Sequence, residues 1–326
     1  MINWGIIGLG SMGNAFANAI TEVKNSKLIG IASKSNNKLH TFSKKFKIKP
    51  ENCFIDYEDL LKSNEIDAIY ISTLNDTHVD LILKCVENNK KILCEKPIGL
   101  NLNQAILAFE TIKKHNSFFY EAIAYRSHPQ TQNLLELIDN NAIGKIYKIE
   151  SSFGFKVRKI KNDSRLFNKN SGGGAILDLG CYPISFFNLF ANENNKIDFI
   201  SAEGTNCSTG VDYDAKIKLR IGSNIEAIGS VSFKENLSND CKIYGEKGKI
   251  TIPSPWLPPK KSYIEVENSS SYYKKFTSSE KTIYATQIDN ISNLFIQKSP
   301  DKKNNVNIDE SIEIMKILDN WMNNLL

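Results

Sequence analysis

The feature that most constrains the fold is a glycine-rich turn near the start of the chain, between an apolar run and an amphipathic segment. Residues 8–13 read GLGSMG, and apolar side chains recur at helical spacing in residues 14–23. This is the G-x-G-x-x-G pattern in its strand–turn–helix context. Gly8 permits the tight turn, Gly10 lets a pyrophosphate approach the backbone, and Gly13 allows the helix to pack closely on the strand.

The turn predicts a dinucleotide site, because unpaired N–H groups and the dipole at a helix N-terminus favour phosphate. The other interpretation of the same residues is an ordinary glycine-rich turn between strand and helix. The residues expected to line the phosphate loop are Gly8, Gly10, Ser11, Met12 and Gly13.

Strand-like and helix-like segments alternate over the first 120 residues, and this alternation predicts a parallel sheet with helices on both faces. The expected strands are 3–7, 27–32, 68–73, 91–94 and 117–122, with helices at 14–23, 36–47, 76–88 and 102–115. A chain of 326 residues is too long for one ordinary core and fits two domains. We expect a Rossmann-type doubly wound domain over 1–122.

The pattern changes after residue 145, where short runs of β character are separated by turn residues. These runs are 145–155, 199–206, 215–221, 225–231, 241–244 and 249–252, and the expected helices are 175–190, 282–297 and 308–325. The runs predict a mixed or antiparallel sheet in a second, α+β domain over 123–326. Residues 254–279 are rich in Pro, Ser, Lys and Tyr and give the weakest secondary-structure signal.

Composition disfavours several classes of function. The net charge is +5 from 41 basic and 36 acidic residues, and the lysines are scattered, so nucleic-acid binding is not expected. We expect no membrane span, because no run of 18 apolar residues occurs, and no signal peptide at the N-terminus. The six cysteines show no CxxC pairing and the four histidines do not cluster, so we expect reduced thiols in a cytoplasm and no metal site.

The end of the second expected strand indicates which dinucleotide binds. An acid about twenty residues beyond the glycines would accept hydrogen bonds from the adenosine ribose, but Ser33 stands there. Lys34 follows directly, and Lys38 lies one helical turn further on. This environment suits a 2′-phosphate, so NADP is favoured and NAD remains possible. The alternative is that both lysines are solvated surface residues.

Two further strand ends carry residues suited to the cofactor, because ligands bind outside the carboxyl ends of parallel strands. STLNDTH at 72–78 begins with two small residues that let a ribose lie close, and EKP at 95–97 follows an apolar strand. The alternative for His78 is a residue in the first turn of a helix, and the alternative for EKP is a charged turn. The cofactor-contacting residues expected from these strand ends are Thr73, Leu74, Asn75, His78, Glu95, Lys96 and Pro97.

Four stretches together resemble the GFO/IDH/MocA oxidoreductase family. They are GIIGLGSMG at 5–13, STLNDTHVDLILKCVENNKKILCEKPIGLN at 72–101, EAIAYRSHPQ at 121–130 and GGGAILDLGCYP at 172–183. The last two are more narrowly similar to the branch that holds dimeric dihydrodiol dehydrogenase and NADP-linked D-xylose dehydrogenase. The resemblance covers nearly the whole chain.

The resemblance implies hydride exchange between nicotinamide and a hydroxyl carbon of a sugar, polyol or cyclic diol. It places Lys96 in the active site, with a cis peptide before Pro97. It implies that the domain over 123–326 has a large open sheet, which is a common dimer face, and serves substrate binding and oligomerisation. It also marks Asp178 and Tyr182, although many family members have histidine where this chain has Tyr182. We therefore expect a homodimer or higher homo-oligomer.

The residue types are consistent with alcohol oxidation. Tyr182 is the expected proton carrier; a free phenol has a pKa of about 10, which a neighbouring ammonium such as Lys96 would lower. Asp178 lies four residues earlier, on the same face of an expected helix, and would orient substrate hydroxyls or hold Lys96. Arg126 would anchor substrate or phosphate. The alternatives are a dipole-facing acid for Asp178, packing for Tyr182 and a salt bridge for Arg126.

Three functions stay open at this point. The first is an NADP-dependent sugar or diol dehydrogenase. The second is a keto-sugar or nucleotide-sugar reductase of polysaccharide synthesis, and the third is a non-catalytic NAD(P)-sensing regulator on the same fold. The joint presence of Lys96, Asp178 and Tyr182 favours catalysis over sensing.

Overall fold

The computed structural model describes residues 1–297 and 304–325, which form two compact units. The first comprises Met1–Ser127 and Lys281–Ile312, and the second comprises His128–Glu280 and Glu313–Leu326. The division expected from the sequence, 1–122 and 123–326, differs in one main respect. A C-terminal segment returns to the first unit, so neither unit is one continuous stretch of chain.

The first unit is built on a seven-stranded sheet of the described residues, with strand order β15-β6-β5-β4-β1-β2-β3. All neighbouring strands are parallel except β15 and β6. The chain runs outward from β1 to β3 on one side, then from β4 to β6 on the other. The strand order therefore reverses between β1 and β4, where open α/β sheets bind ligands. The strands are β1 Ile2–Ile7, β2 Ser26–Ala32, β3 Cys53–Phe54, β4 Ala68–Ile71, β5 Lys91–Cys94, β6 Phe119–Glu121 and β15 Val306–Asn307.

Helices alternate with these strands, as the sequence predicts. They are α1 Ser11–Ala19, α2 Asn36–Phe46, α3 Tyr57–Lys62, α4 His78–Glu87, α5 Leu102–His115, α8 Ile283–Gln297 and the first turn of α9 Ile308–Asn323, with shorter turns at Ile20–Glu22, Pro50–Asn52, Asn75–Thr77 and Ala124–Ser127. Side chains satisfy exposed amides where helices begin. The Asn101 Oδ1 accepts from the Gln104 amide at the start of α5 (3.0 Å), and Ser35 has the same role at α2.

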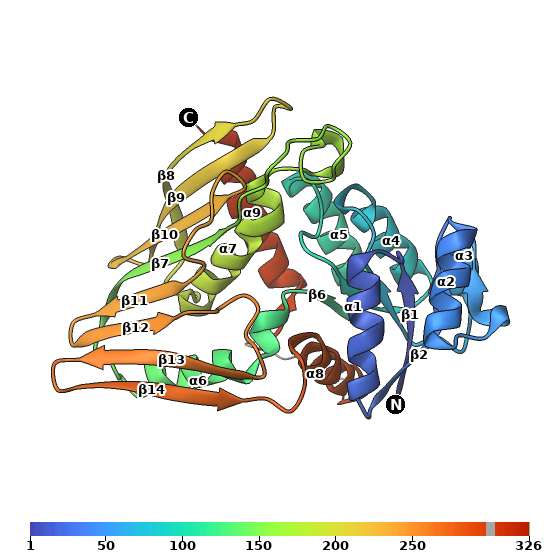
Figure 1. Ribbon diagram of the computed structural model, residues 1–326, viewed down its shortest axis with the longest axis horizontal. Coiled ribbons are helices and arrows are strands. Elements are labelled where there is room, and N and C mark those ends of the chain that lie inside the picture. The colour runs from blue at the N-terminus through green and yellow to red at the C-terminus, as the bar shows by residue number, and fades with distance from the viewer. Residues whose placement is uncertain (298–303, 326) are drawn as a thin grey trace. The chain divides into compact units, whose positions relative to one another are not determined.

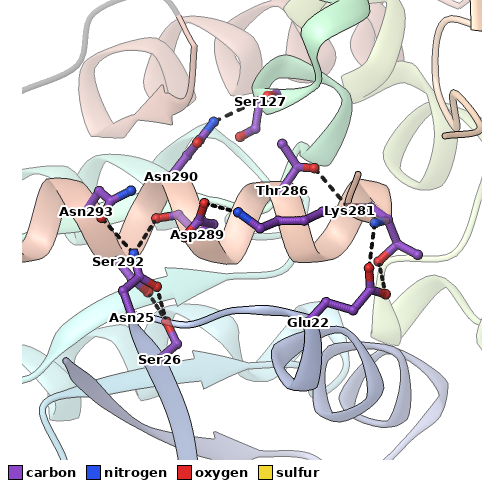
Figure 2. Close-up of polar contacts among 11 residues, drawn as sticks. Glu22, Asn25, Ser26, Ser127, Lys281, Thr286, Asp289, Asn290, Ser292 and Asn293 are labelled. Carbon is purple, nitrogen blue, oxygen red and sulfur yellow. Dashed lines mark hydrogen bonds and ion pairs between the residues drawn. The ribbon is translucent and has the colours of Figure 1, made fainter. Parts of the chain in front are cut away.

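Helix α8 explains why the C-terminal segment belongs to the first unit. Its apolar face, which includes Ile288 and Phe295, is buried in the core that contains Trp4 and Phe16. Polar contacts fasten both ends of the helix, and Figure 2 shows Glu22 at one of them. The Glu22 carboxylate accepts from the amide and hydroxyl of Thr282, the residue before α8 (3.0 and 2.9 Å). Figure 2 also shows a contact between Ser26 and Ser292 further along the helix.

The second unit holds an eight-stranded sheet with order β14-β13-β12-β11-β7-β10-β9-β8. Among the described strands only β7 and β10 are parallel neighbours, so the sheet is mixed, and the expectation of a mixed or antiparallel sheet is confirmed. Helix α7 runs along one face of this sheet (Figure 1). The strands are β7 Ile146–Gly154, β8 Ile197–Asn206, β9 Asp212–Ile221, β10 Ile225–Ser232, β11 Cys241–Gly245, β12 Gly248–Ile252, β13 Lys261–Asn268 and β14 Ser271–Ser278.

Two parts of the second unit were not predicted from the sequence. The weakly patterned stretch 254–279 forms the hairpin of β13 and β14, whose turn is closed by the Asn268 Oδ1 accepting from the Ser270 and Ser271 amides. Helix α6, Pro129–Asp139, was also not predicted; its proline occupies the first turn, where no amide partner is needed.

The helix expected over 175–190 has three parts. They are a π turn at Ile176–Gly180, α7 at Cys181–Phe187 and a short turn at Asn188–Phe190. A further short turn spans Lys169–Ser171. No helix within the described ranges is both long and apolar enough to span a bilayer.

Candidate active site

The glycine loop between β1 and α1 has three different environments for its three glycines. Gly8 has a φ of +98°, which L side chains rarely adopt. A Cβ on Gly13 would lie 2.4 Å from the Gly8 carbonyl oxygen, so the helix rests directly on the turn. A Cβ on Gly10 would meet no described heavy atom within 4 Å. The loop is thus closed by Gly8 and Gly13, while Gly10 faces the open space that a pyrophosphate would need.

The residues expected at the adenosine end lie where β2 passes into α2. Ser33 is buried, and its hydroxyl accepts from the Ser35 amide (3.2 Å). Lys34 and Lys38 are exposed, and the Lys34 Nζ lies 5.6 Å from the centre of the Tyr57 ring. The ring face attracts the ammonium and restrains it beside the end of β2. Tyr57 was missed by the sequence analysis, because it begins a short helix that periodicity alone did not reveal.

After β4 the chain presents small and polar groups at the same sheet edge. Thr73 and Asn75 are half-buried, Leu74 is exposed, and the Thr77 hydroxyl donates to the Thr73 Oγ1 (2.6 Å). His78 is fully buried. Its Nδ1 lies 2.8 Å from the Pro97 carbonyl oxygen and its Nε2 lies 3.4 Å from that of Thr73.

Burial lowers the pKa of His78, so the ring is neutral at neutral pH. In the structure His78 therefore ties the loop after β4 to the turn after β5. Direct contact of His78 with cofactor stays a prediction.

The turn after β5 holds Glu95, Lys96 and Pro97. Glu95 is buried, and its Oε1 accepts from the hydroxyl of Tyr70, whose ring stacks on Phe16 of α1 with centroids 4.2 Å apart. The Lys96–Pro97 peptide is cis, as the resemblance implies. Glu95 is thereby linked through Tyr70 to the helix that follows the glycine loop.

Lys96 is half-buried among titratable groups of its own unit. Its charge acts on the His78 ring, the Glu121 carboxyl and the Tyr284 phenol. Burial raises the pKa of Tyr284, the Glu95 charge raises it further, and Lys96 opposes both effects. Tyr284 lies on α8, far away in the chain, and no local sequence signal links it to Lys96.

Arg126 is placed differently from a simple ligand anchor. Its side chain is 2% exposed, and its guanidinium forms a two-pronged ion pair with Glu310 at the start of α9, with Nη2 and Oε2 3.2 Å apart. Two parallel N–H···O bonds of this kind are strong and directional. Arg126 thus holds the first turn of α9, which belongs to the same unit, and its contact with substrate stays a prediction.

Asp178 and Tyr182 lie on consecutive turns of the π–α7 segment in the second unit. Asp178 is buried, and its Oδ1 accepts from the Nη1 of Arg165 (2.9 Å). The Tyr182 ring packs edge-on against Phe153 of β7 (5.1 Å between centroids) and tilted against Trp256 (5.8 Å). Arg165 was missed because it lies in a polar stretch without periodicity.

A buried acid holds the start of this segment. The Asp212 Oδ2 accepts from the Ile176 amide (2.6 Å), and burial raises the pKa of Asp212 to about 6. Gly174 has a φ of +118°, and a Cβ there would lie 2.2 Å from the Asp212 Oδ1. Only glycine therefore lets the chain pass this close to the carboxylate. No motif in the sequence pointed to Asp212.

Each unit gathers its own share of the predicted residues. The first holds the glycine loop, the adenosine-end residues, His78, the EKP turn and Arg126, and the second holds Asp178 and Tyr182. The meeting of Lys96 with Tyr182 joins residues of different units and stays a prediction. Across residues 1–297 and 304–325, no three His, Cys, Asp or Glu side chains form a group that could hold a metal ion.

A doubly wound sheet with a glycine loop at its switch point defines a dinucleotide-dependent enzyme class, and comparison with known proteins identifies the family. Residues 2–145 match the oxidoreductase family with an NAD-binding Rossmann fold named GFO/IDH/MocA, and residues 131–251 match the C-terminal domain of that family. The chain belongs to the GFO/IDH/MocA oxidoreductase family. The family resemblance, fold class and oxidoreductase activity expected from the sequence are confirmed.

Named relatives refine the comparison. Trans-1,2-dihydrobenzene-1,2-diol dehydrogenase of Xenopus tropicalis is 33% identical over 258 residues, which cover 78% of this chain and 76% of the relative. The Mus musculus enzyme of the same name is 29% identical, with coverage of 79% and 76%. A 3-ketoreductase of Actinomadura kijaniata, solved with NADP and TDP-benzene, superposes with a TM-score of 0.88 over 99% of this chain and 98% of its own; at 19% identity this shows the fold alone.

Proposed function

We propose that this protein is an NADP-dependent dehydrogenase that moves a hydride between the cofactor and a hydroxyl carbon of a cyclic diol or sugar. One observation carries the proposal. Gly10 follows β1 and Lys96 follows β5, and β4 lies between these strands in a parallel sheet. The phosphate loop and the lysine therefore share one sheet edge, where a bound dinucleotide would lie.

The roles of the side chains follow from the balance of alcohol oxidation. A bound nicotinamide would supply the hydride acceptor. Tyr182 takes the proton from the substrate oxygen, Lys96 donates a hydrogen bond to that oxygen and favours the phenolate, and Asp178 orients a second hydroxyl. General acid–base help of this kind is worth about 10²–10⁴ in rate. In the carbonyl-reducing direction Tyr182 returns the proton.

The surroundings of Tyr182 favour a substrate with an apolar ring face. Phe153 and Trp256 flank the phenol, and Trp256 also packs edge-on against Phe186 (6.0 Å). Aromatic walls bind a carbocyclic or sugar ring through its C–H face, while Asp178 provides polar recognition. The names of the two dihydrodiol dehydrogenases described above support the same substrate class, a cyclic 1,2-diol.

The test is a turnover assay with cyclic trans-diols and aldoses, run with NADP and NAD side by side. Lys96→Ala should lower kcat at least a hundredfold while NADPH still quenches or shifts fluorescence on binding. Lys114→Ala, an exposed lysine of α5, is the matched control and should behave as wild type. Full activity in Lys96→Ala would refute the proposed chemistry, and cofactor binding without turnover of any substrate would favour a sensor.

We also propose a homodimer formed through the sheet of the second unit. Strand β14 ends that sheet and exposes three aromatic side chains, Tyr272, Tyr273 and Phe276. Large exposed apolar groups gathered on one strand are typical of an interaction surface. Light scattering should give twice the mass of the chain. The six free thiols support a cytoplasmic location, which cell fractionation would test.

A further inference from the structure

A buried carboxyl lies behind the EKP turn and has no role in the proposed chemistry. Glu121 is the last residue of β6, where it pairs with Cys94, the last residue of β5. The strands are parallel, so Glu121 lies at the same sheet edge as the turn that carries Lys96. Its side chain is 1% exposed. A carboxyl is rarely buried this deeply unless a partner requires it.

The groups around Glu121 come from two directions. Beyond β5 lie the Ile98 amide and the Lys96 ammonium, and from α9 come Ser311 and Glu310, the latter already paired with Arg126. Burial raises the pKa of Glu121 to about 7, while Ser311, Ile98 and Lys96 act to lower it.

The charge of Glu310 acts against the ionised form of Glu121. Among the described residues, the Glu121 Oε2 has no hydrogen-bond partner. An ionised carboxylate with one unsatisfied oxygen needs a nearby cation. The Lys96 ammonium has the charge that favours the ionised form of Glu121, while Arg126 is paired with Glu310.

We propose that Glu121 is a positioning residue for Lys96: its carboxylate fixes the Ile98 amide behind the turn and supplies the negative charge that keeps Lys96 an oriented ammonium. The inference rests on the proposed function, because it assigns Lys96 the role given there. The inference adds a residue that does not contact substrate. It makes the protonation and the orientation of Lys96 depend on a carboxyl buried inside the same unit.

The experiment measures Lys96 directly and without substrate. Competitive acetylation across pH 6–11, read by mass spectrometry, gives the pH midpoint at which Lys96 becomes reactive. Glu121→Gln removes the charge and keeps the shape, so the midpoint should fall by roughly one pH unit. Glu313→Gln removes the same charge from an exposed site on α9 and should leave the midpoint unchanged.

A second readout separates positioning from folding. The wild-type kcat should rise with pH through about 7 as Glu121 ionises, and Glu121→Gln should lose this limb while KM for NADPH changes little. If Glu121→Gln fails to fold, Glu121→Asp, which withdraws the carboxylate by one methylene, is read in the same two assays. A midpoint and pH profile equal to wild type in whichever variant folds would overturn the inference.

Failure of the proposed function would look different. A wild-type protein that turns over no diol or sugar would refute the dehydrogenase, and the acetylation midpoints would still decide the link between Glu121 and Lys96. Normal wild-type turnover with unshifted midpoints would refute the link alone.

Discussion

Two glycine-to-alanine substitutions in the phosphate loop should separate folding from cofactor binding. Gly10 has a φ of −87° and a ψ of −158°, a conformation that alanine adopts readily, and its Cβ would meet no described heavy atom within 4 Å. Gly10→Ala should therefore leave stability unchanged or raise it by about 0.4–1 kcal/mol, because alanine restricts the unfolded chain.

The same methyl group should damage binding. It would occupy the space that a pyrophosphate needs in order to receive hydrogen bonds from the loop amides. The loss of one charge-assisted hydrogen bond costs about 1.5–3 kcal/mol. That corresponds to a Kd for NADPH roughly ten to a hundred times weaker. Gly10→Ala should thus fold normally and bind poorly.

Gly13→Ala is the contrasting variant. Its Cβ would lie 2.4 Å from the Gly8 carbonyl oxygen, so either α1 or the turn must move. Overpacking of this kind costs about 1–3 kcal/mol of folding free energy. Both stability and NADPH affinity should fall in this variant.

Urea denaturation at pH 7 and titration of NADPH fluorescence measure the two quantities independently. Wild-type NADPH affinity in Gly10→Ala would show that the pyrophosphate does not approach this backbone, and the assignment of the loop would be refuted. Equal destabilisation by Gly10→Ala and Gly13→Ala would contradict the packing argument.

Two further substitutions probe the charges in each unit. Lys34→Asp should shift the preference from NADP towards NAD by at least tenfold in kcat/KM, because it removes the cation held near Tyr57. Lys24→Asp is the control at another exposed lysine. An unchanged NADP/NAD ratio in Lys34→Asp would contradict binding of a 2′-phosphate at this lysine. Burial raises the pKa of Asp212 from 3.8 to about 6, so its stabilising contribution is complete below pH 3.8 and is lost as the pH rises through 6. In the wild type, the free energy of unfolding should change between pH 4 and pH 7 by about 3 kcal/mol more than in Asp212→Asn, as measured by urea titration at both pH values. The same change with pH in the wild type and in Asp212→Asn would show that Asp212 is not its source.

The elements with strong apolar periodicity, or with turn residues at their ends, could be predicted from the sequence. The glycine turn, the strands of the first unit up to β6 and the strands β7 to β12 lie within a few residues of their expected positions, and β3 is the exception. Each of these segments carries its own signal, either alternation of apolar residues or glycine at a turn. Their assembly into a Rossmann-type sheet and a mixed sheet followed from general rules of chain connection.

What was missed depends on contacts between distant parts of the chain. Helix α8 was predicted as a helix, but no local pattern indicates that it packs with Trp4, nearly 290 residues earlier. That packing brings Tyr284 near Lys96. Arg126 was read as a ligand anchor or a salt-bridge partner, and only the fold brought Glu310 to it. Such partners are set by tertiary packing and leave no local pattern.

Two buried acids, Glu121 and Asp212, were not predicted from the sequence, and each lies close to a segment that carries a candidate reactive group. Glu121 lies behind Lys96 in the first unit, and Asp212 holds the segment that carries Tyr182 in the second. Burial raises the pKa of Glu121 from 4.5 to about 7 and that of Asp212 from 3.8 to about 6. Each ionised carboxylate therefore costs the fold about 3 kcal/mol at alkaline pH, a large fraction of the stability of a typical domain.

A chain under selection for stability alone would replace such acids with apolar or amide side chains. Their presence at these two positions, rather than elsewhere in the cores, is what a functional requirement for charge predicts. If both acids serve the reaction, Glu121→Gln and Asp212→Asn should each stabilise the protein above pH 7 while lowering kcat. If either substitution raised stability and left kcat unchanged, that acid would be only a feature of the fold.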